Sequence, residues 1–292
     1  MKRVFFILLS FILILFVVIT LIKNDSKNKI EHGLEKEYST AEKERIQNFW
    51  ETYRLANKSR IAGQLKEAAD GYKKALQFND QHEDALYYLG NVLLDLGEYA
   101  EAEKCWNKLI QINPHSARAH FQLGNLYLNH IRKEVFNINM AEKHFREVLS
   151  INEEESGSIF CLGQIELIRG NLINARQLFG AVSGLNYQNL DATFFNSYID
   201  WKTDSLDRAI SRLTNAIRSI QNAKSETVGT GEGDTKLGKP LYSTDRLGRK
   251  SLFYKYTHDL KGLDPSTINS QFEIRYRNLD VYLNQLQKMV SS

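Results

Sequence analysis

Hydrophobic residues are distributed unevenly along the chain, and the longest apolar run lies near its start. Residues 4–22 read VFFILLSFILILFVVITLI, with Ser10 and Thr20 as the polar members of the run. At 1.5 Å per residue, a helix of this run spans about 28 Å, close to the thickness of the hydrocarbon core of a bilayer. We therefore expect a transmembrane helix and assign residues 1–22 to an N-terminal signal anchor.

A cleaved signal peptide is the alternative, because Lys2 and Arg3 precede the apolar run. Two features favour the anchor: the run exceeds the usual apolar core of a signal peptide, about 7–15 residues, and no small-residue cleavage site follows it. The next segment, residues 23–40, is rich in charged and polar side chains. We expect it to form a polar linker.

From residue 41 onwards, apolar residues return at a fixed period. Alanines recur at steps of 34, 39, 34 and 34 residues, and two further columns follow the same steps. The columns are Ala68, Ala102, Ala141, Ala175 and Ala209; Leu55, Leu89, Leu123 and Leu162; and Tyr72, Trp106, Phe145, Phe179 and Leu213. A period of this length indicates stacked supersecondary units. The longer step predicts a lengthened turn between residues 129 and 140.

The second unit shows best which residue types the columns hold. Its residues are Leu86, Leu89, Gly90, Leu93, Gly97, Ala102, Trp106, Leu109 and Pro114. This arrangement resembles the tetratricopeptide repeat, in which two antiparallel helices pack through small residues and an aromatic side chain. The resemblance covers about residues 49–222, and the first and fifth units match it less closely. It implies an all-α tetratricopeptide-repeat solenoid of about five helix pairs, which we assign to residues 41–223.

Two further regions follow the repeats. Residues 224–250 are rich in Gly, Thr and charged residues and have no helical periodicity, so we expect a flexible loop. Residues 251–292 form a C-terminal segment whose final helix carries an apolar stripe: Phe272, Tyr276, Leu279, Leu283, Leu286 and Val290. That stripe predicts a helix that caps the last repeat, with self-association through the same helix as the alternative.

Charge and composition bear on the kind of partner. The net charge is +3, and no long block of Lys and Arg with interleaved aromatic residues is present, so nucleic acid is not expected as a partner. Cys105 and Cys161 are isolated and are expected to be buried. The histidines lack metal-ligand spacing and no nucleophile motif occurs, so we expect no cofactor, no metal and no enzymatic activity.

The first helix of each unit presents two regular columns on one helical face. In the family, this face lines the concave side. The candidate peptide-binding residues are the rings of Tyr53, Tyr87, Phe121, Phe160 and Phe194 and, four residues later, Asn57, Asn91, Asn125, Gln164 and Tyr198. The carboxamides are similar to the asparagine ladder of some peptide-binding members, which implies an extended peptide as ligand. The alternative is that the rings pack between helices and the amides are simply solvated.

Taken together, these features predict a membrane-anchored scaffold that recruits a protein or extended peptide through the concave face of its repeats. Two alternatives stay open: a chaperone-like protein that holds a client in cytochrome or envelope-protein maturation, and a structural subunit of a membrane complex. The membrane contact would be residues 4–22. The short basic N-terminus favours a single-pass protein of a prokaryotic inner membrane with an extracytoplasmic solenoid.

Overall fold

The computed structural model describes residue 19 and residues 39–129, 135–185, 189–227, 253–257, 260 and 268–291. Apart from Ile19, the predicted anchor at residues 1–22 lies outside these ranges, as do most of the predicted linker and of the predicted loop at residues 224–250. None of the helices within the described ranges has the combination of length and hydropathy needed to cross a bilayer.

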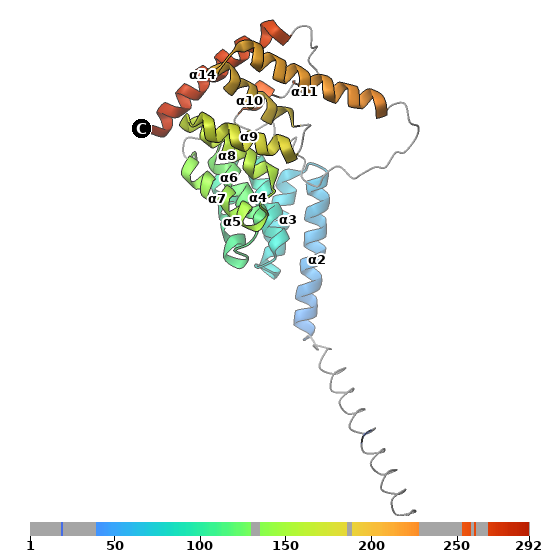
Figure 1. The fold of residues 1–292 in the computed structure, drawn as a ribbon. Coiled ribbons are helices and arrows are strands. Elements are labelled where there is room, and N and C mark those ends of the chain that lie inside the picture. Colours follow the sequence, from blue (N-terminus) through green and yellow to red (C-terminus); the bar gives the residue numbers. More distant parts are fainter. Residues whose placement is uncertain are drawn as a thin grey trace, which may run out of the picture.

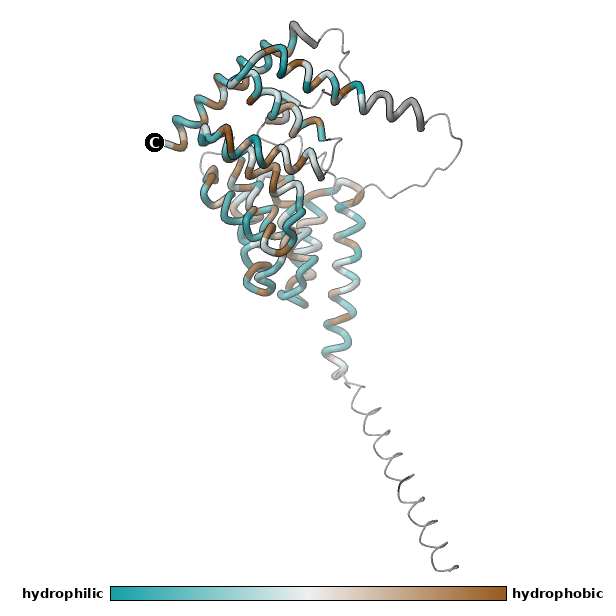
Figure 2. Tube along the Cα trace, viewed as in Figure 1, coloured by the Kyte–Doolittle hydropathy of each residue, from teal (hydrophilic) through white to brown (hydrophobic). Residues whose placement is uncertain are grey.

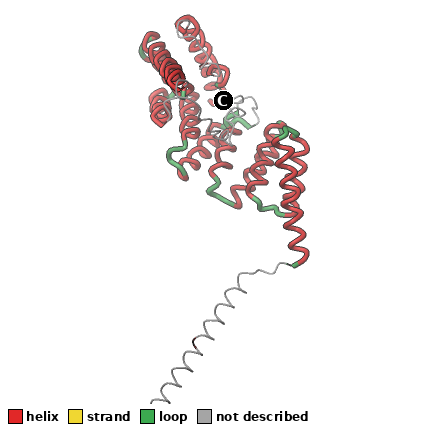
Figure 3. Tube along the Cα trace, turned by 90° about the vertical axis from the view of Figure 1, so that its right-hand side faces the viewer, coloured by secondary structure: helices red, strands yellow, loops and turns green. Residues whose placement is uncertain are grey.

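The described part of the chain is built from helices, and no strand occurs in it. The helices are α2 (Thr40–Ile61), α3 (Leu65–Phe78), α4 (Glu83–Leu96), α5 (Tyr99–Ile112), α6 (Ala117–Tyr127), α7 (Ile138–Ile151), α8 (Ser156–Arg169), α9 (Leu172–Leu185), α10 (Leu190–Thr203), α11 (Leu206–Thr227), α13 (Tyr254–Thr257) and α14 (Ile268–Ser291). From α2 to α11 they form successive pairs, each packed on the next (Figure 1). The predicted all-α solenoid is confirmed, and Figure 3 shows its helices following one another in a curved stack.

In two units, the first helix ends at a glycine in the left-handed conformation. Gly97 and Gly170 have φ of 83° and 81°, and the backbone N–H of each bonds to carbonyls of the last turn of α4 or α8. Only glycine takes this conformation without a steric penalty, so each helix stops there and the chain turns back into its partner.

Small residues in the first helix of a unit receive a large ring from the second. A Cβ added at Gly90 would lie 2.4 Å from Nε1 of Trp106, and one added at Gly124 would lie 2.7 Å from Cε1 of Phe145. Both rings are fully buried. The repeated glycine column therefore sets how closely the two helices of a pair approach. Hydrophobic and hydrophilic positions alternate along these helices, as expected when one face of each is buried (Figure 2).

The first unit departs from the predicted leucine column. Leu89, Leu123 and Leu162 are buried, whereas Leu55 at the equivalent position is 52% exposed. The reason is its place in the stack, because α2 is the first described helix of the solenoid and no described pair precedes it to cover this leucine.

The predicted cap, helix α14, contacts more of the solenoid than the last repeat alone. Contacts of α14 are made with α11 in the fifth unit and also with α8 in the fourth. Its side chains Phe272, Tyr276, Leu279, Leu283 and Leu286 are buried, while Val290, predicted as part of the same stripe, is exposed. Figure 1 shows α14 crossing the upper end of the solenoid beside α10 and α11. The helix thus covers two units.

A candidate protein-binding groove

The ten candidate residues lie on the first helices of the five units, α2, α4, α6, α8 and α10. We call the surface that these helices present on the predicted concave side the inner face. Six of the candidates are half-buried: Tyr53, Asn57, Asn91, Phe121, Asn125 and Phe160. Four are buried: Tyr87, Gln164, Phe194 and Tyr198. The inner face is therefore unevenly accessible from one end to the other.

The rings of this face also contribute to packing within the units. The centroid of the Phe121 ring lies 5.9 Å from that of Phe145, edge to face, and the Phe160 ring lies 5.6 Å from that of Phe179 in the same geometry. Such pairs add to the stability gained from burying the rings. The rings of Phe121 and Phe160 thus pack against core side chains and also form part of the inner face.

Tyr87 is covered by residues of the next unit. The guanidinium of Arg118 lies 4.8 Å from the centroid of the Tyr87 ring and pairs with the carboxylate of Asp84 at 2.5 Å. Nε2 of Gln122 also donates to the Tyr87 hydroxyl at 3.3 Å. The repeat columns of the sequence did not single out Arg118. A signal was available, because Asp84 and Arg118 occupy the same repeat position in consecutive units and carry opposite charges.

The carboxamides are partly engaged by their own helices. Nδ2 of Asn57 donates to the carbonyl of Tyr53 at 3.2 Å, and Oδ1 of Asn57 accepts from the hydroxyl of Tyr72 at 2.8 Å. In the same way Nδ2 of Asn125 donates to the carbonyl of Phe121 at 3.0 Å. Oδ1 of Asn91, by contrast, is buried and accepts no hydrogen bond from the described residues.

Arg60 supplies a cation beside this row. Its Nε donates to the hydroxyl of Tyr72 at 3.0 Å, and its guanidinium lies 4.4 Å from the centroid of the Tyr88 ring. Burial raises the pKa of Tyr72 to about 12, although the charge and hydrogen bond of Arg60 act in the opposite direction. Tyr72 is therefore a neutral donor to Asn57 at physiological pH. Within the described part of the chain, Arg60 forms no ion pair with a carboxylate.

The inner face of the fifth unit is covered by α14, which corrects the prediction for Phe194 and Tyr198. These two side chains are 0% and 1% exposed. The Phe194 ring centroid lies 5.5 Å from that of Tyr276, and the hydroxyl of Tyr198 donates to Asp280 at 2.8 Å. Because the protein's own C-terminal helix contacts both residues, they are not open to an added partner.

Asp280 on α14 forms an ion pair with α10 of the solenoid. Nζ of Lys202 lies 2.5 Å from its carboxylate, in addition to the Tyr198 hydrogen bond. Burial alone would raise the pKa of Asp280, but Lys202 and Tyr198 outweigh it and hold the pKa below its usual value. The carboxylate is therefore ionised and paired.

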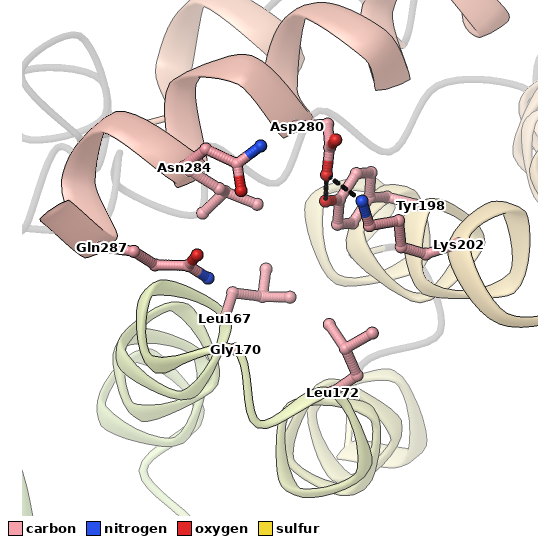
Figure 4. A pocket seen from close by; sticks show the side chains of 9 residues that line it. Leu167, Gly170, Leu172, Tyr198, Lys202, Asp280, Asn284 and Gln287 are labelled. Carbon is pink, nitrogen blue, oxygen red and sulfur yellow. Dashed lines mark hydrogen bonds and ion pairs between the residues drawn. The ribbon is translucent and has the colours of Figure 1, made fainter.

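A cavity of about 210 Å³ remains beneath α14, between α8, α10 and the α8–α9 turn. Figure 4 shows its lining, which includes Leu167, Gly170, Leu172, Lys202, Asp280 and Gln287. Lys202 and Asp280, the two opposite charges on its wall, neutralise each other. The cavity is a gap in the packing of α14 that carries no uncompensated charge from this pair.

Neither thiol is activated for chemistry. Burial raises the pKa of Cys105 to about 11 and raises that of Cys161 as well, so both are protonated thiols near neutral pH. In the ranges that the structure describes, His, Cys, Asp and Glu side chains do not gather in groups of three or more that could hold a metal ion. The inner face combines aromatic rings, carboxamides and the cations Arg60, Arg118 and Lys202.

Two family models match the middle of the chain. One, described as a TPR repeat, matches residues 90–130, and the other, described as a tetratricopeptide repeat, matches residues 72–104. Among curated proteins, no sequence matches the chain.

Solved structures share the fold at low sequence identity. A crystal structure of MamA protein has a TM-score of 0.53 and 17% identity, covering 64% of this chain and 98% of its own. MamA from Desulfovibrio magneticus RS-1 has a TM-score of 0.53 and 15% identity, with 60% and 96% covered. PilF from Pseudomonas aeruginosa has a TM-score of 0.51 and 18% identity, with 82% and 99% covered. The chain therefore contains tetratricopeptide repeats within residues 72–130, and its stacked helix pairs have the fold of a tetratricopeptide-repeat solenoid.

Proposed function

We propose that this protein is a membrane-anchored scaffold that recruits a protein partner through the inner face of its first three units. We call that surface, formed by α2, α4 and α6, the open half of the inner face. The observation that supports it is the contrast with the fifth unit. There α14 buries Phe194 and Tyr198, whereas Tyr53, Asn91 and Phe121 in the open half stay half-buried. The open half also carries Arg60, which has no carboxylate partner among the described residues.

An open row of rings and polar groups has the composition of a protein-binding surface. Aromatic residues and arginine dominate the energetics of such interfaces, and partly exposed rings lose little conformational entropy on binding. Tetratricopeptide-repeat proteins bind proteins or peptides, which agrees with this use of the surface.

The test uses substitutions that separate the open half from the rest of the solenoid. We expect Asn91→Ala to weaken capture of the partner by about five- to thirtyfold, the effect of losing an interface contact worth about 1–2 kcal/mol. Folding should be unaffected, because Oδ1 of Asn91 receives no hydrogen bond from the described residues. Gln111→Ala on the exposed side of α5 is the matched control.

Binding would be measured with the full chain in detergent, first by affinity capture and mass spectrometry, and then as a dissociation constant for the partner identified. Circular dichroism would verify that each variant is folded. Equal dissociation constants for Asn91→Ala, Phe121→Ala and the control would reject the open half as the binding surface.

The anchor is tested separately. The apolar run at residues 4–22 supports membrane attachment, and the basic residues before it support an extracytoplasmic solenoid. We expect the full chain to stay in the membrane pellet after an alkaline wash, and a form lacking residues 1–38 to be released. An alkaline phosphatase fused after Ser292 should be active; an inactive fusion that is made in full would place the solenoid on the cytoplasmic side.

A further inference from the structure

The inner face already holds one helix, and we infer from this arrangement that the partner of the open half is an amphipathic α-helix that carries a carboxylate. The inference rests on the proposed function above and specifies its ligand. A helical ligand differs from the extended peptide that the row of amides predicts.

The first reason is the way in which α14 is bound. This helix presents its apolar stripe to the solenoid, with Phe272, Tyr276 and Leu279 fully buried. On its opposite side Ile274 and Val281 are 61% and 58% exposed. A helix laid against a groove by one apolar face is a common mode of peptide recognition, and this chain uses it on its own inner face.

The second reason is how the inner face holds the acid of that helix. Tyr198, at the amide-column position of α10, donates to Asp280, and Lys202 one turn later pairs with the same carboxylate. The Tyr276 ring stacks on Trp201 with 5.8 Å between centroids. On α14, Tyr276 and Asp280 lie one turn apart. Tyr276 stacks on the ring of Trp201 and Asp280 pairs with Lys202, both on α10.

The third reason is the state of the amides in the open half. An extended peptide needs free donors and acceptors for its backbone, but Nδ2 of Asn57 and Nδ2 of Asn125 already donate to carbonyls of their own helices. Gln164, the last amide of the row, is buried. A helix satisfies its backbone internally and makes no such demand, so it fits this surface without breaking these bonds.

The fourth reason is charge. In the open half, Arg118 is paired with Asp84, whereas Arg60 contacts a tyrosine hydroxyl, an amide oxygen and a ring, with no carboxylate partner in the described part of the chain. A guanidinium has five N–H donors and prefers a carboxylate. The acid of the bound helix is therefore expected to face Arg60, as Asp280 faces Lys202.

Two displayed peptide libraries would test the inference against the full chain in detergent. One fixes an α-helical scaffold and randomises one face; the other consists of linear peptides with a central proline, which interrupts a continuous helix. We expect the helical library to yield binders that contain Asp or Glu among an aromatic and aliphatic stripe. Binding of these peptides should fall at least tenfold for Arg60→Glu and recover when the acid of the peptide is changed to Lys. Lys66→Glu on the outer helix α3 is the matched charge reversal and should have no effect.

The outcomes distinguish a wrong ligand from a wrong binding surface. Binders that come only from the proline library and depend on Asn91 or Phe121 would overturn the helical ligand while supporting the open half as a binding surface. Helical binders that are indifferent to Arg60→Glu would overturn the carboxylate. If neither library yields a binder that depends on the open half, both this inference and the proposed function fail.

Discussion

At Gly90, the first helix of the second unit comes so close to Trp106 that no side chain fits between them. We expect Gly90→Ala to lower the free energy of unfolding by about 1–3 kcal/mol, because an added Cβ must displace a buried ring. Gly180→Ala is the control: among the described residues, no atom beyond the adjacent residues and the backbone of its own helix lies within 4 Å of the added Cβ, and alanine favours the helix by up to about 1 kcal/mol. Urea denaturation would measure both. A Gly90→Ala variant as stable as wild type would contradict the close approach.

A second residue-scale prediction concerns the buried pair His120 and His144. Their Nδ1 atoms are 2.9 Å apart, and Nε2 of His120 lies 3.1 Å from the carbonyl oxygen of Pro114. Since a carbonyl can only accept, Nε2 of His120 carries a proton; in the neutral ring, its Nδ1 then accepts from Nδ1 of His144. Burial, together with His120 and Lys143, lowers the pKa of His144 to about 4.

This pair should make stability depend on pH. Between about pH 6.5 and pH 4 the unfolded His144 binds a proton and the folded one does not, so the free energy of unfolding falls as the pH falls, by up to about 3 kcal/mol. Denaturation at pH 7, 5.5 and 4.5 would measure the slope. His144→Gln should flatten it, whereas the exposed His115→Gln should not. Equal slopes for wild type and His144→Gln would rule out this role.

Residue roles that repeat from unit to unit could be predicted, and roles set by distant segments could not. The close packing of Gly90 and Trp106 follows from columns that recur every 34 residues. The burial of Phe194 and Tyr198 depends on α14, whose two hydrogen bonds with α10 join residues 79 and 82 positions apart. Periodicity carries no information about such a contact, and it equally misses the exposure of Leu55 at the start of the stack.

At the scale of elements, α14 is predicted to be an integral part of the fold. Leu279→Ala should cost about 2–5 kcal/mol, because the leucine is fully buried against the solenoid. Val281→Ala on the exposed side of the same helix should change stability by no more than about 0.5 kcal/mol. Thermal or urea unfolding would distinguish them. If the two variants unfold alike, α14 does not pack where the structure places it.

The apolar stripe of α14 predicted that this helix would pack, and the choice of surface had to come from the structure. A spacing of three and four residues identifies a buried face but not its counterpart. The counterpart consists of Phe194, Ser197 and Tyr198 on α10 together with contacts to α8. From α2 to α11, in contrast, helices that are consecutive in the sequence also pack against each other. Their arrangement could therefore be predicted.

At the scale of the whole molecule, the two ends of the inner face differ in whether α14 covers them. Its fourth and fifth units contact the protein's own helix α14, whereas no helix of the described ranges covers Tyr53, Arg60, Asn91 and Phe121 in this way. Sequence periodicity predicted one continuous peptide-binding row. The structure buries two members of that row, Phe194 and Tyr198, beneath α14.

Site-specific photo-crosslinking tests this division most directly. A benzoylphenylalanine would be placed in the full chain at position 91 in the open half, at position 281 on the exposed side of α14, and at position 111 on α5. We predict a partner adduct from position 91 and none from positions 281 and 111. An adduct from either of those positions, with none from position 91, would contradict binding through the open half of the inner face.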